Sequence, residues 1–266
     1  LPIFLSIFFK KKTKIILRIS GLPKINLIRK LFWKIFSNRI HKITCPTRGT
    51  YDFLIKQKIF SPNKILILKD PIIDMKKFSN LSKSQIDTKF LNKKIISGIG
   101  RLTNQKNFEL LIRFFKEIEE KYPEFILVIL GEGEERNKLQ KLIYDLKLQN
   151  KVYLQGYEKN VYKFLINSKY FILSSLWEDP GFVLIEAALS NSTIIASACP
   201  NGPIEIIKNK NFLFNNNDKD DLIKKFENLE NIADLKVILD QKKDVKKRIM
   251  EYTKFYHYKS LIKILN

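Results

Sequence analysis

From residue 93 onward, short apolar runs alternate with longer amphipathic stretches. This alternation is typical of βα units around a parallel sheet, because buried strands read as continuous apolar runs and each connecting helix buries one face. The pattern therefore predicts an α/β domain with a Rossmann-like sheet. Strands are expected at 94–98, 125–130, 152–154, 170–174, 193–196 and 211–214, and helices at 107–121, 134–147, 160–167, 181–190 and 219–229.

The amino-terminal part of the chain shows fewer elements, with strands expected at 14–19, 42–45 and 64–68 and helices at 24–37 and 50–56. Three strands and two helices make a poor stand-alone sheet, so this lobe is expected to be incomplete. The polar stretch that follows contains Pro71 and predicts a linker between two lobes. The expected organisation is a partial lobe at 1–75, a linker at 76–92, a second lobe at 93–240 and a helical tail at 241–266.

The 266 residues suffice for one large or two modest domains with substantial cores. Cys45 and Cys199 lie far apart in the sequence, and the two histidines, His41 and His257, are isolated. Neither a disulfide framework nor a Cys/His metal cluster is therefore expected. The sequence favours a reducing compartment and a chemistry that needs no metal.

The chain carries 49 Lys and Arg against 27 Asp and Glu, a formal net charge of +22 that attracts anionic partners. The excess is uneven, because residues 1–51 hold twelve cations and no acid. Two interpretations stay open for this segment: contact with an anionic surface, or a solvated basic face exaggerated by a Lys-rich composition. Residues 1–9 are apolar but far shorter than the roughly 20 residues of a membrane-spanning helix.

Two carboxylates, Glu178 and Glu186, flank the junction between an expected strand end and an expected helix. Glu178 lies in the loop, and Pro180 is expected in the first turn of the helix. Glu186 then lies five residues further, about 7.5 Å along the helix axis from Gly181 at about 1.5 Å per residue. The two acids are expected to contact different parts of one ligand, with the anion-binding N–H groups of the first turn between them. The alternative is a helix cap at Glu178 and a solvated Glu186.

The loop after the first strand of this region contains Arg101 and Lys106, with Gly98 and Gly100 allowing close approach of the backbone. Loops at the carboxyl ends of parallel strands converge on one crevice, where ligands collect. Two cations there suit a diphosphate, since hydrogen bonds with a charged partner contribute roughly 1.5 to 3 kcal/mol each. The alternative interpretation is that both residues are solvated surface cations. This alternative is stronger for Lys106 than for Arg101.

These residues resemble the retaining nucleotide-sugar glycosyltransferases of family 4, which have the two-lobed GT-B fold. The similar segments follow the family's order and spacing from about residue 94 to 230. The most specific is the Glu-x7-Glu element formed by Glu178 and Glu186. The others are Gly100-Arg-Leu-Thr-Asn-Gln-Lys-Asn107, Leu127-Val-Ile-Leu-Gly-Glu-Gly133, Val152-Tyr-Leu-Gln-Gly-Tyr157, 173–178, 181–187 and Ala198-Cys-Pro-Asn-Gly-Pro203.

The resemblance implies roles for the matched residues. Arg101 and Lys106 would neutralise the donor diphosphate and stabilise the leaving nucleotide. Glu186 would hold the ribose hydroxyls, and Glu178 would contact hydroxyls of the transferred sugar. The catalytic set would thus be Glu178, Arg101 and Lys106, with the backbone of Gly181, Phe182, Val183 and Leu184 around sugar and phosphate oxygens and with Gly156 and Tyr157 near the base.

The resemblance also implies a hexosyltransferase that moves a sugar from a UDP- or GDP-sugar to a saccharide or lipid-linked saccharide, with retention of configuration and without a metal or other cofactor. In front-face attack the leaving phosphate would accept the acceptor's proton, and preorganised cations would stabilise its developing charge. Such enzymes serve polysaccharide, lipopolysaccharide or glycolipid synthesis in the cytoplasm, some of them peripherally on the inner face of the cell membrane. The expected partners are a nucleotide sugar, an acceptor and an anionic membrane surface, and no nucleic acid.

Two departures from the family's pattern bear on these expectations. The usual Glu-Gly-Phe-Gly is replaced by Glu178-Asp-Pro-Gly-Phe182, which alters the backbone expected to contact the donor. Residues 1–75 resemble only the latter part of the family's acceptor-side lobe, without its glycine-rich loop. The chain is therefore expected to fold its donor-binding lobe at 93–240 and to be unable to catalyse transfer by itself.

Other functional classes explain fewer of these residues. A glycoside hydrolase also uses two carboxylates, about 5 to 9.5 Å apart, but has no need of Arg101 and Lys106. A GT-B sugar-nucleotide epimerase binds a similar ligand, although the Glu-x7-Glu spacing argues against it. A basic nucleic-acid-binding protein has only the net charge in its favour, because the sequence shows no recognition motif. The epimerase and the nucleic-acid-binding protein stay as alternatives.

Overall fold

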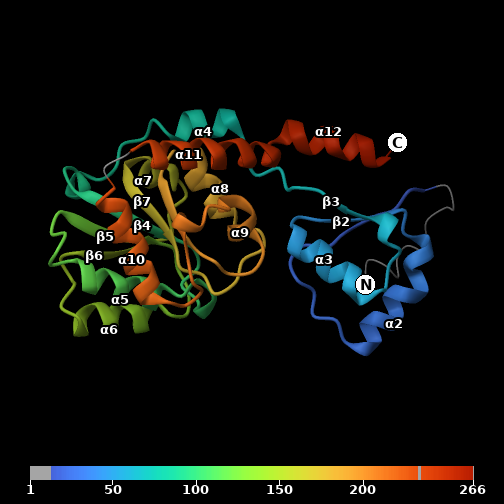
Figure 1. Ribbon diagram of the computed structural model, residues 1–266, viewed down its shortest axis with the longest axis horizontal. Helices are drawn as coiled ribbons and strands as arrows, with labels where there is room; N and C mark the ends of the chain where they lie inside the picture. The colour runs from blue at the N-terminus through green and yellow to red at the C-terminus, as the bar shows by residue number, and fades with distance from the viewer. Residues whose placement is uncertain (1–12, 233–234, 266) are drawn as a thin grey trace. The chain divides into compact units, whose positions relative to one another are not determined.

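The computed structural model describes residues 13–232 and 235–265, and the chain divides into two compact units (Figure 1). Unit 1 comprises Leu1–Ile72 and Glu251–Asn266, and unit 2 comprises Ile73–Met250. The apolar run at 1–9 and the three lysines that follow it lie outside the described residues. Each unit is α/β with a parallel sheet, so the predicted fold class is confirmed.

Unit 2 is built around a six-stranded parallel sheet with the strand order β6-β5-β4-β7-β8-β9. The chain starts at β4, adds β5 and β6 on one side, and then returns to add β7, β8 and β9 on the other. The order therefore reverses between β4 and β7, the place where open sheets of this kind bind ligands. The strands are β4 (Lys94–Ile99), β5 (Phe125–Leu130), β6 (Val152–Gly156), β7 (Ser168–Leu173), β8 (Thr193–Ser197) and β9 (Leu213–Phe214).

Helices cover both faces of this sheet (Figure 1). Helix α5 packs against α6 and α10, whereas α8 packs against α7 and α11. The described helices of the unit are α4 (Met75–Leu81), α5 (Phe108–Ile118), α6 (Arg136–Asp145), α7 (Tyr162–Asn167), α8 (Phe182–Leu189), α9 (Gly202–Ile207), α10 (Lys219–Glu230) and α11 (Lys236–Ile249). Short 3-10 turns are η4 (Thr88–Phe90), η5 (Asn104–Lys106) and η6 (Lys210–Phe212).

An aromatic cluster fills the interface between the sheet and one helical layer. Phe226 of α10 lies with its ring centroid 5.5 Å from Phe114 of α5, 5.5 Å from Phe125 of β5 and 5.2 Å from Tyr170 of β7. These contacts are mostly edge to face, a favoured arrangement for aromatic rings. Every residue of β5 is buried, which explains its unbroken apolar sequence.

Unit 1 contains a three-stranded parallel sheet in the order β1-β2-β3 within its described residues. The core beside this sheet includes Ile40, Ile43, Cys45 and Leu54, all nearly inaccessible to solvent. None of the described helices in either unit is both long and apolar enough to cross a bilayer. The elements of unit 1 are β1 (Ile16–Arg18), α2 (Leu27–Phe36), η2 (Ser37–Arg39), β2 (Lys42–Cys45), α3 (Arg48–Gln57), η3 (Pro62–Lys64), β3 (Ile65–Ile67) and α12 (Lys254–Leu265).

Two parts of the expected organisation take a different form in the structure. Residues 76–92, expected to link the lobes, form most of α4 and all of η4 and belong to unit 2. Phe78 packs edge-on against Tyr162, and the buried Phe90 packs against Phe164, so this stretch is folded onto the unit. The expected tail at 241–266 is divided, because it ends α11 of unit 2 and then forms α12 of unit 1.

The start of α8 also differs from expectation. Pro180 is not in the first turn, because the helix begins at Phe182 and Gly181 is its N-cap. The Asp179–Pro180 peptide bond is cis, and Gly181 has a φ of +83°, a left-handed conformation that favours glycine.

Truncation of Phe226 tests whether the aromatic cluster stabilises unit 2. We expect Phe226→Ala to lower the free energy of unfolding by about 3 to 5 kcal/mol, because it opens a cavity in a fully buried cluster. Urea denaturation of the variant and the parent chain measures the difference. Tyr144→Ala is the matched control, since Tyr144 is 69% exposed and its loss should change the free energy little. Equal effects of the two substitutions would contradict the assigned packing.

Candidate functional site

The candidate site is built from two loops that leave the sheet where its strand order reverses. One loop follows β4 and spans 100–107, and the other follows β7 and spans 174–181. Since β4 and β7 are adjacent parallel strands, their carboxyl ends lie side by side and deliver both loops to the same edge. This placement brings the two loops singled out in the sequence into contact.

Hydrogen bonds hold these two loops together. The hydroxyl of Ser174 donates to the carbonyl of Lys106 at 2.8 Å, and the amide of Leu176 donates to the carbonyl of Gln105 at 2.8 Å. The side-chain amide of Gln105 in turn donates to the carbonyl of Trp177 at 2.8 Å. Three bonds over so short a stretch fix the position of one loop relative to the other.

The loops also carry an ion pair between two predicted site residues. Lys106 Nζ lies 2.5 Å from Glu178 Oε1, and the hydroxyl of Ser175 donates to the same oxygen at 2.6 Å. The Lys106 side chain is 16% exposed and that of Glu178 is 6% exposed. The ammonium of Lys106 and the carboxylate of Glu178 therefore neutralise each other. Cys199 lies buried nearby, and burial together with the negative charge of Glu178 raises the pKa of its thiol to about 12.

The carboxylate of Glu186, on α8, makes no hydrogen bond or ion pair with any of the described residues, whereas the backbone carbonyl of Glu186 accepts from the hydroxyl of Ser190 at 2.9 Å. Burial raises the pKa of its carboxyl, and the positive charge of Lys77 on α4 opposes that shift. Its neighbour Tyr162, at the start of α7, has a pKa raised to about 12 by its own burial, with the negative charges of Glu186 and Asp74 adding to the shift. Glu186 is therefore a partly buried acceptor that is available to a ligand.

A cavity of about 280 Å³ opens beside the loop that carries Arg101. Arg101 is exposed and makes no side-chain hydrogen bond or ion pair with the part of the chain that the structure describes. Tyr157, which is 79% exposed, lines the same cavity with Glu158. The full lining is Ile99, Gly100, Arg101, Leu130, Gly131, Glu132, Tyr157, Glu158 and Val161.

Two glycines permit the backbone to pack closely around the site. A Cβ on Gly131 would lie 1.8 Å from the carbonyl oxygen of Gly100, and Gly131 has a φ of +141°. A Cβ on Gly202 would lie 1.6 Å from the carbonyl oxygen of Pro180. Any side chain at these positions would push apart the segments that carry Arg101 and Glu178. Gly156, which the sequence places near the base, has a φ of +84° and is the last residue of β6.

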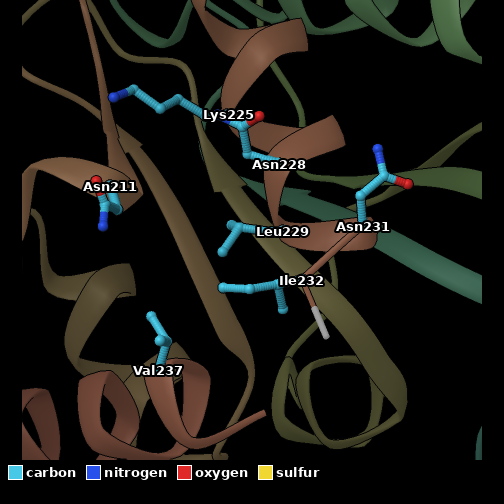
Figure 2. A pocket seen from close by; sticks show the side chains of 7 residues that line it. All are labelled: Asn211, Lys225, Asn228, Leu229, Asn231, Ile232 and Val237. Atoms are coloured by element: carbon cyan, nitrogen blue, oxygen red, sulfur yellow. The ribbon is translucent and has the colours of Figure 1, made fainter. Parts of the chain in front are cut away.

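A second cavity, of about 500 Å³, lies elsewhere in unit 2, and its lining includes none of the predicted site residues (Figure 2). Its one charged lining residue, Lys225, donates to the carbonyl of Lys210 at 2.9 Å. The remaining lining is Asn211, Asn228, Leu229, Asn231, Ile232 and Val237. No group of three or more His, Cys, Asp or Glu residues suited to a metal ion occurs among residues 13–232 and 235–265.

Residues 81–247 match the family described as "Glycosyl transferases group 1", and this segment includes every residue of the candidate site. The chain belongs to the group 1 glycosyl transferases. Its relatives include an uncharacterised glycosyltransferase of Methanocaldococcus jannaschii, MJ1059, which is 44% identical over 149 residues that make up 54% of this chain and 36% of the relative.

Another group 1 relative is the N-acetylgalactosamine-N,N'-diacetylbacillosaminyl-diphospho-undecaprenol 4-alpha-N-acetylgalactosaminyltransferase of Campylobacter jejuni. It is 27% identical over 212 residues, which are 77% of this chain and 56% of the relative. The chain thus spans about half the length of the curated relatives it matches, or less.

The structure of Alr3699/HepE from Anabaena in complex with UDP has the same fold, with a TM-score of 0.76 at 14% identity. The match covers 95% of this chain and 72% of that one. Together with the parallel sheets, it shows that this group 1 glycosyl transferase has the predicted GT-B type α/β architecture.

Sequence reasoning did not find the residues that hold the site together. Gln105, Ser174 and Ser175 lie inside the recognised motifs, but the sequence indicates no role for them. Gln105 and Ser174 contact backbone carbonyls of the facing loop, and Ser175 contacts the side chain of Glu178 in its own loop. Asn216 was also missed; its side chain joins the carbonyl of Leu176 to the hydroxyl of Ser197. For the serines, position directly after a buried strand was the available signal, whereas Asn216 had none.

Removal of the Lys106 ammonium should destabilise the protein, because the buried carboxylate of Glu178 would lose its partner. We expect Lys106→Met to lower the free energy of unfolding by about 3 kcal/mol, because it strands a buried carboxylate. Lys106→Met combined with Glu178→Gln should recover at least about 1 kcal/mol of that loss in a double-mutant cycle measured by urea denaturation.

The exposed pair of Lys94 and Glu124, with N–O separation of 2.8 Å and side chains 47% and 42% exposed, supplies the control. Lys94→Met should lower the free energy of unfolding by less than about 1 kcal/mol, because solvent screens that pair. Additive effects at Lys106 and Glu178 would show that the two side chains do not interact in solution.

Proposed function

We propose that this group 1 glycosyl transferase moves a hexosyl unit from a UDP- or GDP-sugar to a saccharide or lipid-linked saccharide acceptor with retention of configuration. The observation that carries the proposal is the buried pair of Lys106 and Glu178 at the switch point of the sheet, beside the cavity lined by Arg101. A cation and a carboxylate brought together at that edge suit a ligand that has both phosphates and hydroxyls.

The named relatives support the choice of substrates. One acts on a diphospho-undecaprenol-linked saccharide, and a protein of the same fold was solved with UDP. We assign the donor to the crevice beyond β4 and β7. We assign the acceptor to the class of lipid-linked saccharides used in cell-surface glycan synthesis, with the enzyme in the cytoplasm and peripheral on the inner face of the membrane.

In the proposed mechanism Lys106 exchanges one partner for another when the donor binds. The donor diphosphate takes the place of Glu178 as the acceptor of the Lys106 ammonium hydrogen bonds, and Arg101 neutralises a second phosphate oxygen. Glu178 is then free to accept a hydrogen bond from a hydroxyl of the transferred sugar. The first-turn amides of α8, from Phe182 to Leu184, add a positive potential beside the sugar and phosphates.

Bond cleavage between the anomeric carbon and the diphosphate leaves negative charge on the departing nucleotide. Lys106 and Arg101 stabilise that charge, and because the site is already organised, little reorganisation is needed in the transition state. The acceptor hydroxyl attacks the same face of the sugar and transfers its proton to the leaving phosphate oxygen, so configuration is retained. Neither a protein nucleophile nor a metal or other cofactor takes part in this scheme.

The nucleoside is assigned to Glu186 and to the cavity lined by Tyr157. An ionised Glu186 accepts hydrogen bonds from the ribose hydroxyls, and its lack of a partner among the described side chains leaves it available for them. The base would lie near Gly156 and Tyr157, because Tyr157 lines this cavity.

Calorimetry with UDP, GDP and a single-stranded oligonucleotide tests the donor site on the parent chain and its variants. At least one nucleotide should bind, and Arg101→Ala and Glu186→Ala should each weaken it by about tenfold or more, since each removes a charged hydrogen-bond partner. The matched controls are Arg113→Ala, in helix α5, and Glu120→Ala, in the turn after it; both change exposed residues and should bind as the parent does. Binding of the oligonucleotide alone would favour the nucleic-acid-binding alternative.

Nucleotide affinity should depend on pH through Glu186. Its carboxyl must be ionised to accept both ribose hydroxyl hydrogen bonds, and its pKa is raised by burial. Affinity is therefore fully present above that raised pKa and lost as the pH falls through it, at a higher pH than for an ordinary glutamate. Calorimetric titrations of UDP across pH on the parent and on Glu186→Gln isolate this effect, because the phosphate of UDP titrates equally in both. Parallel profiles would refute the assignment.

A further inference from the structure

Helix α2 of unit 1 exposes large apolar side chains along its whole length. The structure buries none of its residues, and Leu27, Ile28, Leu31 and Ile35 are 85%, 75%, 61% and 60% exposed. Surface helices of globular proteins normally turn such residues toward the core. So many exposed aliphatic side chains on one short helix indicate a surface that meets a partner.

The exposed side chains form one continuous face, which we call the apolar face of α2. Each residue advances a helix by about 100°, so Leu27, Leu31, Ile35, Ile28 and Phe32 fall within about 140° of arc. The helix packs onto its own unit from another side. There the ring centroid of Trp33 lies 5.4 Å from that of Phe60, which belongs to the core of unit 1. The apolar face is thus directed away from the core that holds the helix.

Positive charge borders the apolar face. Lys30 and Lys34 lie one turn apart on the same flank, and neither forms an ion pair with the described residues. From Thr13 to Tyr51 the sequence has no Asp or Glu, and Asp52 is the first acid of the described chain. The surroundings of the apolar face are therefore complementary to an anionic partner.

We propose that α2 lies in the interfacial plane of a bilayer that contains anionic phospholipid. Leu31 and Ile35 enter the boundary between head groups and acyl chains, and Lys30 and Lys34 contact the head-group phosphates. A helix of 10 residues is about 15 Å long, which suits lying on a membrane and not crossing it. A symmetric contact between two copies of α2 would instead bring the same cations face to face.

This inference deepens the proposed function, on which it rests for the idea of a lipid-linked acceptor, but its evidence lies in unit 1 and is independent of the donor site. Binding to a membrane would place the enzyme on the surface where such an acceptor is presented. Vesicle binding and nucleotide binding are separate measurements, so either assignment can fail while the other holds.

Sedimentation of the 266-residue chain with vesicles of phosphatidylglycerol and phosphatidylcholine tests the proposal. The parent should bind and should be released by salt, and Leu31→Asp with Ile35→Asp should weaken binding by about tenfold or more. The matched control is Tyr144→Asp with Ile166→Asp, because these exposed residues lie in unit 2 and the added charge is the same. Lys30→Gln with Lys34→Gln should weaken binding by about tenfold and reduce its salt dependence.

Three outcomes would overturn the proposal: no vesicle binding by the parent, equal binding to pure phosphatidylcholine, or equal losses in the α2 and control variants. Circular dichroism and urea denaturation show whether the α2 variant is still folded, including unit 1, which contains α2. A loss of vesicle binding with unchanged circular dichroism and denaturation localises the effect to the apolar face of α2.

A fluorescent label at position 31 gives a second, direct measurement. Both native cysteines, Cys45 and Cys199, are buried, so an environment-sensitive thiol dye should react selectively with Leu31→Cys. Its emission should shift to the blue when anionic vesicles are added, and a dye on Tyr144→Cys should not respond. A blue shift that grows with protein concentration in the absence of vesicles would indicate self-association through α2 and contradict the proposal.

Discussion

The ion pair between Lys106 and Glu178 is the contact on which the organisation of the site depends. It joins the loops after β4 and β7, whose carboxyl ends are adjacent only because the strand order reverses there. Removing both charges from water is costly, and Ser175 and the close geometry offset that cost. The pair therefore sets the separation of the two loops while keeping each charge neutralised in the absence of substrate.

Close backbone packing supports this pair from both sides. Gly131 lets the loop after β5 approach that of Gly100, and Gly202 lets the start of α9 approach Pro180. Gln105 adds direct hydrogen bonds between the loops. Because these contacts use backbone atoms and small residues, they fix the position of the charged groups without occupying the space that a ligand needs. Preorganisation of this kind is what electrostatic stabilisation of a leaving diphosphate requires.

The sequence predicted the parallel sheet of unit 2 well, because strands such as β5 are buried on both faces and read as unbroken apolar runs. It placed Arg101, Lys106 and Glu178 in loops after strands and Glu186 in the following helix, but it did not indicate that Lys106 and Glu178 bind each other. That pairing depends on the register of two loops separated by 72 residues. The packing of residues 76–92 onto unit 2 could not be predicted for a related reason. Phe78 and Phe90 pack against Tyr162 and Phe164, which lie more than 70 residues later in the sequence.

The large positive charge of the chain has two physically different components. Lys106 is largely buried and paired with the Glu178 carboxylate beyond the carboxyl ends of β4 and β7. A Lys-rich composition alone does not account for a lysine in that position. Lys30 and Lys34 are solvated and border an exposed apolar face. They attract anionic groups at long range and are not paired with one fixed carboxylate among the described residues. In the proposed function Lys106 meets one phosphate in one geometry, and its preformed partner and largely buried position suit that role. In the proposed membrane contact Lys30 and Lys34 meet a fluid, uniformly charged surface, for which solvated side chains without a fixed partner suffice.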